Sequence, residues 1–314
     1  MHKKTYHHLL IVGLFTAVSL TWGTTWMAMK IAVSAVPPIF ATGLRFLCSA
    51  PLLLLLARYK KVPLLFPSGQ WSFQVYVTLF YFALPFTLMI YGERYTSSSL
   101  ASIIFATMPA IILILSLLVL RERTSIQQIL GLGMSISALS IILWHEMHHT
   151  TGTNQLRGMV ALLVAVCMHG IMYVQCKKRC VGMSVLSYNA LPSLGAGTLL
   201  TFAGLCESPH LQNFTLQALL AIIYLGIIAG VGGVLAYFSL QQITKPFQAS
   251  MVFMIFPLIA VILERIINGS CMMSSYSLML LAPFLLGMVL ILYRIPPQLD
   301  RKPIRAIFKN LIPK

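Results

Sequence analysis

Four long stretches of this 314-residue sequence contain no Asp, Glu, Lys or Arg, and they limit what the chain can fold into. They cover residues 62–92, 95–120, 180–206 and 208–244. Each is longer than the roughly 20 residues that a helix needs to cross a bilayer. Only 9% of all residues are charged, whereas about 25% are charged in a soluble domain. The sequence therefore predicts an all-α integral membrane protein with several spans.

Apolar runs separated by helix breakers divide the chain into ten predicted transmembrane helices. Turns are expected at Pro37-Pro38, at Ser208-Pro209 and at Asn268-Gly269, because Pro and Gly interrupt helices. The predicted helices cover residues 9–29, 39–57, 72–91, 98–120, 126–144, 158–176, 184–206, 217–239, 248–267 and 276–293.

The basic residues gather in alternate loops between these helices. Of the 22 Lys and Arg residues, 17 lie on the side of the two termini, and five lie on the other side or in the adjoining half of the membrane. The positive-inside rule therefore predicts that both termini are cytoplasmic. Because this topology accounts for the net charge of +16, no nucleic-acid partner is expected. The five residues are Lys30, Arg45, Arg94, Arg157 and Arg265.

Two separate alignments reveal an internal repeat. Trp22–Lys30 aligns without gaps on His169–Lys177, glycine on glycine, at an offset of 147 residues. Ser102–Leu115 aligns on Ser250–Leu263, proline on proline, at an offset of 148 residues. Each repeat then holds five helices, and an odd number gives the two halves opposite orientations. Inverted repeats of this kind build carriers whose substrate site lies between the halves, near the middle of the membrane.

The same region carries a family resemblance. WGTTWMAMKIA at Trp22–Ala32, LRF at Leu44–Phe46, the run Glu93–Glu122 and the glycine-rich segment Gly131–Leu143 resemble an EamA domain. The chain is thus similar to the drug/metabolite transporter superfamily, with two EamA repeats over nearly its whole length. The resemblance implies a ten-helix carrier of the inner membrane, commonly an exporter of amino acids or related small metabolites. It implies no enzymatic activity and no cofactor.

Three parts of the chain follow from the helices and the resemblance. They are a first EamA repeat at 9–144, a second repeat at 158–293 and a basic cytoplasmic tail at 294–314. The second repeat departs from the family pattern, because Ser270 stands where Glu122 stands in the first, so no role is carried over from that acid. The expected partners are a small-molecule substrate and the lipid bilayer, with a homodimer left open.

Ionisable side chains within the predicted bilayer are functional candidates, because burying them is unfavourable. Arg45 and Lys30 are cationic, and no acid in the middle of the membrane balances them, which favours a substrate with a carboxylate or another anionic group. Snorkelling of Lys30 to the interface is the alternative for that residue, and a structural pair with Glu93 or Glu264 is the alternative for Arg45. Aromatic residues could stack on the substrate. The predicted substrate-binding residues are Trp22, Lys30, Arg45, Tyr81, Tyr91, Tyr173 and Tyr237.

Energy coupling and movement have fewer candidates. His169, Glu93 and Glu264 are the titratable residues closest to the membrane path, and they are the candidates for proton coupling. Export that follows the substrate gradient without protons stays open. Pro109 and Pro257 occupy matching positions in the repeats and are predicted hinges. Packing without movement is the alternative for both prolines.

The segment WHEMHH at Trp144–His149 contains the zinc motif H-E-x-x-H. An intramembrane zinc metalloprotease using His145, Glu146 and His149 is therefore the alternative function. The motif is predicted in the loop after the fifth helix, whereas such an enzyme needs it inside a span. The one Asp of the chain, Asp300, lies in the cytoplasmic tail and cannot be the third ligand. We expect a polar loop with no catalytic metal, and adventitious or regulatory metal binding by the His145–His149 cluster stays open.

A secondary transporter that works by alternating access is the function these observations favour. A sensor or scaffold that transports nothing is a further alternative, and Arg45 and His169 argue against it because a scaffold needs no polar residue near the middle of the membrane. Substrate identity and the direction of transport stay open.

Overall fold

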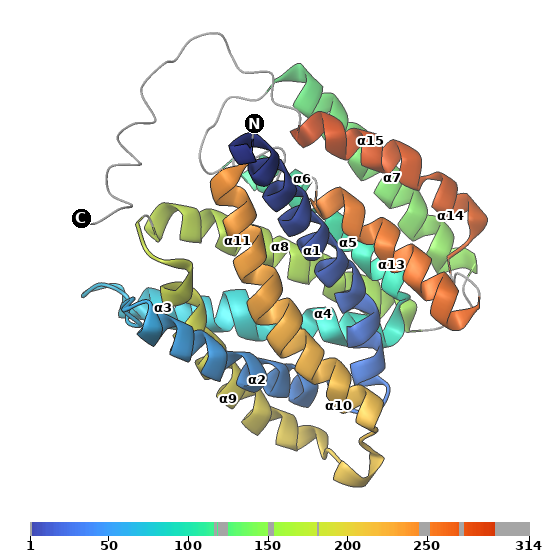
Figure 1. Cartoon of the computed structure of the whole chain (residues 1–314). Helices are drawn as coiled ribbons and strands as arrows, with labels where there is room; N and C mark the ends of the chain where they lie inside the picture. The colour runs from blue at the N-terminus through green and yellow to red at the C-terminus, as the bar shows by residue number, and fades with distance from the viewer. Residues whose placement is uncertain are drawn as a thin grey trace.

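The computed structural model describes residues 2–115, 118, 125–149, 154–180, 182–244, 252–269 and 273–292, and every regular element in these ranges is a helix (Figure 1). The basic tail at 294–314 and Glu122 lie outside them. The helices are α1 (His2–Val33), α2 (Pro38–Tyr59), α3 (Trp71–Val77), η1 (Thr78–Ala83), α4 (Leu84–Tyr95), α5 (Ser98–Ala106), α6 (Met108–Leu115), α7 (Ile126–His149), α8 (Gln155–Arg179), α9 (Val185–Gly204), η3 (Leu205–Glu207), η4 (Leu211–Asn213), α10 (Leu216–Ile223), η5 (Tyr224–Gly233), α11 (Val234–Ile243), α13 (Val252–Asn268), α14 (Ser275–Met279) and α15 (Leu281–Leu292).

These elements form ten consecutive helical segments in the described part of the chain, which confirms the predicted fold class. The third segment runs from α3 to α4, the fourth from α5 to α6, the eighth from α10 to α11 and the tenth from α14 to α15. Eight segments are long and apolar enough to cross a membrane. The other two are α9, with 20 residues, and α13, with 17 residues, and each packs along an apolar partner helix.

Corresponding helices of the two repeats run in opposite directions. In the pair α2 and α9, Phe40 near the start of α2 lies against Gly204 at the end of α9. In the pair α7 and α15, the Gln128 side chain near the start of α7 donates to the carbonyl of Ile291 near the end of α15, at 3.0 Å. Both pairs are therefore antiparallel, as inverted repeats require, and they lie on different sides of the molecule (Figure 1).

The two repeats also contain the same packing contact, and the residues that form it are equivalent in the sequence alignment. A Cβ added to Gly23 of α1 would lie 2.6 Å from Ile259 of α13, and one added to Gly170 of α8 would lie 2.7 Å from Ile111 of α6. Gly170 follows Gly23 by 147 residues and Ile259 follows Ile111 by 148. The same glycine-on-isoleucine contact thus occurs once in each half, since small residues let helices approach closely.

A π-helical stretch interrupts the third segment of each repeat. It is η1 in the first repeat and η5 in the second, and an offset of 147 residues places Thr78, the first residue of η1, on Leu225 within η5. Stretches of π-helix are rare, and they occur frequently at functional sites because they change the direction of side chains within a helix.

The bundle has two ends, which we name for the residues there. At the Lys30 end, α1, α4, α7 and α13 finish and α2, α5 and α14 begin. At the opposite end, the N-terminal end, α1 begins, and α2, α8 and α11 finish. Helix direction and short connections fix this assignment, and the predicted cytoplasmic termini would place the Lys30 end outside.

Candidate functional site

Arg45 lies on α2 and is buried, with 7% of its surface exposed. Its Nη1 atom donates to the sulfur of Met29 at 3.9 Å, and its guanidinium carbon lies 4.7 Å from the centre of the Phe86 ring. Its Nε atom has no hydrogen-bond partner. Within the described ranges Arg45 forms no ion pair with an acid, so the alternative of a structural pair with Glu93 or Glu264 finds no support.

His169 lies on α8 and also contacts Phe86. Its ring centre is 4.9 Å from that of Phe86, 5.5 Å from Tyr81 and 5.9 Å from Phe105. The imidazole is 7% exposed and interacts electrostatically with Arg45. The structure therefore brings Arg45 and His169 against the same phenylalanine, and Tyr81 packs on His169.

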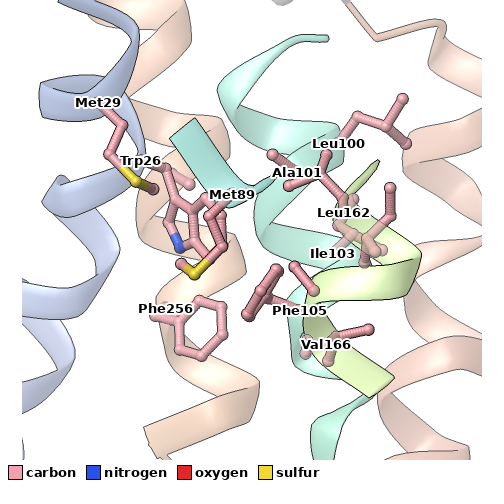
Figure 2. Packing of buried hydrophobic residues seen from close by; sticks show 14 of the residues in the cluster. Trp26, Met29, Met89, Leu100, Ala101, Ile103, Phe105, Leu162, Val166 and Phe256 are labelled. Carbon is pink, nitrogen blue, oxygen red and sulfur yellow. The ribbon is translucent and has the colours of Figure 1, made fainter. Parts of the chain in front are cut away.

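Trp22 and Trp26 lie on α1 and contact aromatic residues of the second repeat, so the site extends in that direction. Trp22 lies 4.8 Å from Tyr237 and 5.9 Å from Phe253, as measured between ring centres. Trp26 lies 5.0 Å from Phe105, and in Figure 2 its indole points from α1 toward Phe256, 6.1 Å away. Aromatic pairs at these separations are attractive beyond the area that they bury.

One aromatic pair is repeated by the internal symmetry. Trp22 faces Phe253 at 5.9 Å, and the equivalent residues His169 and Phe105 face each other at the same distance. The offsets between the two members are those of the sequence alignment, 147 for the first residue and 148 for the second. The centre of the molecule therefore presents Trp from one half and His from the other.

Glycines in η5 make room for two of these side chains. A Cβ on Gly233 would lie 2.8 Å from Nε1 of Trp22, and one on Gly226 would lie 2.5 Å from the backbone oxygen of Arg45. A larger residue at Gly226 would meet the backbone of α2, and one at Gly233 would displace the Trp22 indole. The glycine-rich stretch of the eighth segment thus sets the positions of Trp22 and Arg45.

Four tyrosines gather on the N-terminal side of this centre. The hydroxyl of Tyr81 interacts electrostatically with those of Tyr173, Tyr188 and Tyr237, which come from α8, α9 and α11. Tyr237 is 9% exposed, whereas Tyr173 is 36% exposed. Three of the predicted substrate-binding residues therefore share one region, and Tyr188 joins them.

Lys30 and Tyr91 lie apart from this centre. The ammonium group of Lys30 donates to the backbone oxygens of Glu93, at 2.7 Å, and of Thr96, at 2.5 Å, instead of extending to water as snorkelling requires. Lys30 also interacts electrostatically with the buried acids Glu93 and Glu264, so it does not lack balancing acids. Tyr91 packs on Tyr95 and interacts with the exposed Arg157. Of the two cations, only Arg45 still supports an anionic group on the substrate.

The WHEMHH segment is helical, so the prediction of a loop is wrong. α7 continues through His149, and its last turns are fixed by the start of α14. Glu146 accepts a hydrogen bond from the backbone N–H of Ser274 at 3.1 Å, and the Ser274 hydroxyl lies 3.0 Å from Nδ1 of His145. The side chains of His148 and His149 lie outside the described residues. Among those described, no group of three His, Cys, Asp or Glu residues could hold a metal ion.

Sequence reasoning missed the phenylalanines of the centre, because an apolar ring in a membrane helix carries no distinctive signal. Phe86 and Phe256 carry no signal in the sequence that sets them apart from other phenylalanines. Phe105 and Phe253 do carry a signal in the sequence. They occupy matching positions of the two repeats, at the same offset of 148 residues that relates Pro109 to Pro257. An aromatic residue at matching positions of both halves could therefore have predicted a place in the centre.

Comparison with known proteins places the chain among transporters. The model of the EamA-like transporter family matches residues 9–144 and 156–293. Protein PagO of Salmonella typhimurium is 50% identical over 280 residues, which are 89% of this chain and 91% of PagO. An uncharacterized transporter of Buchnera aphidicola subsp. Schizaphis graminum is 44% identical over 98% of each chain.

More distant relatives agree. The uncharacterized inner membrane transporter YedA of Escherichia coli K12 is 25% identical over 83% of this chain and 84% of YedA. A solved crystal structure with 16% identity has a TM-score of 0.64 and covers 90% of this chain and 95% of that one. This likeness shows a shared fold.

Proposed function

The chain belongs to the EamA-like transporter family and is a multi-pass membrane transporter, and from this premise we propose its substrate class, direction and mechanism. We propose that it exports small amino-acid-like metabolites, which carry an anionic or zwitterionic group, across the inner membrane. The observation that carries the substrate class is the buried guanidinium of Arg45, which has an unpartnered Nε and no acid paired with it in the described ranges.

A buried cation without a paired anion is unfavourable, and binding an anion relieves it. A carboxylate next to Arg45 supplies that anion and accepts charge-assisted hydrogen bonds from the guanidinium. Trp22, Trp26, Phe86 and His169 supply flat surfaces for the rest of the substrate. Tyr81, Tyr173 and Tyr237 supply hydroxyl groups on the N-terminal side.

The proposed mechanism is alternating access between the repeats, whose boundaries we propose as 9–144 and 158–293. Pro109 follows an interruption at Thr107 between α5 and α6, and Pro257 lies within the unbroken α13. We assign both as hinges. Tyr91 is the least supported substrate-binding residue, because it lies beside Tyr95 and away from Arg45.

Proteoliposomes loaded with a panel of amino acids and related metabolites test the substrate class. The native protein should release an amino-acid-like compound, and Arg45→Gln should raise its KM by about tenfold to a hundredfold, because a charged hydrogen bond contributes about 1.5–3 kcal/mol. Arg157→Gln, which changes an exposed arginine of α8, is the matched control and should leave KM unchanged. An unchanged KM in Arg45→Gln would show that the anionic-group assignment is wrong.

Reporter fusions test the orientation, since both termini are proposed to be cytoplasmic. Fusions at Lys61 and Lys178 should report the cytoplasm, and a fusion at Thr151 should report the periplasm. A periplasmic signal at Lys178 would contradict the proposed orientation and would turn the Lys30 end toward the cytoplasm.

A further inference from the structure

A polar cluster at the Lys30 end takes no part in the proposed substrate site. It consists of Lys30 on α1, Glu93 on α4, Ser98 and Ser99 on α5, and Glu264 on α13. The first four residues belong to the first repeat and Glu264 belongs to the second, so the cluster joins the two halves. The side chains of Glu93, Ser98, Ser99 and Glu264 are each at most 1% exposed.

The hydrogen bonds of the cluster leave one carboxylate oxygen unsatisfied. The Ser99 hydroxyl donates to Oε2 of Glu264, and the Ser98 hydroxyl donates to Oε2 of Glu93 at 3.3 Å. Oε1 of Glu93 has no hydrogen-bond partner. A buried ionised oxygen without a partner is far more costly than a buried neutral one, so the geometry favours a neutral carboxyl at Glu93.

The charges of the cluster point the same way. Lys30 supplies one positive charge, and its ammonium group donates to the backbone oxygens of Glu93 and Thr96 while it interacts electrostatically with both acids. Two ionised acids with one ammonium group would leave a net negative charge in a buried site. One proton bound to the acids makes the cluster neutral.

Among the described residues, the other charged side chains near this end are exposed or face other groups. Arg94 on α4, Arg157 on α8 and Arg265 on α13 are exposed. Arg45 on α2 faces Met29 and Phe86, and α5 contains no charged residue. A metal cation is a poorer occupant than a proton, because the ammonium group of Lys30 already lies in the cluster and repels it.

We propose that Lys30, Glu93 and Glu264, with Ser98 and Ser99, form a binding site for one proton that is occupied when the two repeats are closed at the Lys30 end. Opening this end separates α13 from α1 and α5, brings water to the carboxylates and releases the proton there. The coupling to transport rests on the proposed alternating access, whereas proton binding by the closed protein does not.

Dicyclohexylcarbodiimide tests the site directly, because it modifies protonated carboxyl groups in apolar surroundings. The purified native protein is treated over a range of pH, and the modified residues are identified by mass spectrometry of its peptides. Glu93 should be modified at low and neutral pH, and the modification should be lost as the pH rises. Glu146 and Glu207 are internal controls, since each accepts hydrogen bonds from backbone N–H groups at the same end, and both should be modified less than Glu93 at neutral pH.

Two outcomes overturn the proton site: no modification of Glu93 at any pH, or equal modification of all four acids. Labelling needs no variant, so a misfolded mutant cannot decide the result. In proteoliposomes, Glu93→Gln should abolish the response of transport to an imposed pH gradient, and Glu207→Gln should preserve it. Labelling at Glu93 in a protein that transports no metabolite of the panel would support the proton site and contradict the proposed function.

Discussion

Thr96 at the Lys30 end and Thr244 at the N-terminal end directly follow equivalent helices of the two repeats. The two residues have nearly the same backbone dihedral angles. Thr96 has φ −119° and ψ 169°, and Thr244 has φ −123° and ψ 166°. Each hydroxyl donates to the carbonyl oxygen four residues earlier, at 2.9 Å and 2.7 Å respectively. The two ends of the bundle therefore share a backbone plan.

The charges at the two ends do not follow that plan. Gln241 stands at the place equivalent to Glu93, and Phe247 stands at the place equivalent to Ser99, at an offset of 148 residues. Lys60 is the equivalent of Glu207 at an offset of 147. All four acids in the described part of the chain lie at the Lys30 end, where each contacts the start of a neighbouring helix.

This difference separates what the repeat preserves from what it does not. Glycine contacts, helix ends and the central aromatic pair recur in both halves, because the two repeats must pack on each other in the same way. The acids Glu93 and Glu207 do not recur in the other repeat, although Lys30 aligns on Lys177. The two ends of the bundle are therefore alike in helix packing and different in their acidic residues.

The largest loss of stability is expected where the backbones of α2 and α9, one from each repeat, are in direct contact. A Cβ on Gly43 of α2 would lie 2.8 Å from the Cα of Thr201 on α9, and a backbone cannot move aside as a side chain can. Gly43→Ala should lower the free energy of unfolding by about 3 kcal/mol, measured by thermal unfolding in detergent. Gly13→Ala, where nothing lies within 4 Å, is the control. Equal stability of the two variants would contradict the α2–α9 pairing.

The second prediction concerns the unequal charges. Glu207 accepts hydrogen bonds from the backbone N–H groups of Ile39 and Phe40, at 2.9 and 3.1 Å, and so stabilises the start of α2. Glu207→Ala should therefore lower the unfolding free energy by about 2 kcal/mol. Lys60→Ala, at the equivalent exposed position, should change it by less than about 0.5 kcal/mol. Similar losses in both variants would mean that the two ends are not as different as we infer.

A smaller and equal effect is expected at the repeated glycine contact. Gly23→Ala and Gly170→Ala each place a methyl group against an isoleucine side chain, which can shift in part. Each should lower the unfolding free energy by about 1 kcal/mol, as read from the thermal unfolding midpoint beside that of Gly13→Ala. A clear difference between the two would show that the halves do not pack alike.

The smallest effect is expected at the zinc-like motif. His145→Ala removes the contact with Ser274 and the tilted ring contact with Tyr276, whose ring centre is 4.8 Å away, and should lower the free energy of unfolding by less than about 1 kcal/mol. Its metal content, measured by elemental analysis, should match that of the control His210→Ala, which changes an exposed histidine at the same end. Loss of bound zinc in His145→Ala alone would restore the metal-site alternative.

The sequence by itself determined the helices, the repeat and the family. A span is a local property, because a bilayer demands about 20 apolar residues and hydrogen bonding within the segment. The offsets of 147 and 148 residues also placed Trp22 and His169 at equivalent positions, and the structure brings both into one aromatic centre.

Only the tertiary structure decided which side chains meet. Ser99 and Glu264 are 165 residues apart in sequence and share a hydrogen bond, and Trp26 meets Phe256 across the repeats. Lys30 was expected to lack acids and has two beside it, and the Glu of WHEMHH accepts a hydrogen bond from the residue that begins a neighbouring helix. Such contacts depend on the rotation and tilt of each helix, which packing against distant neighbours sets and which hydropathy along one helix does not contain.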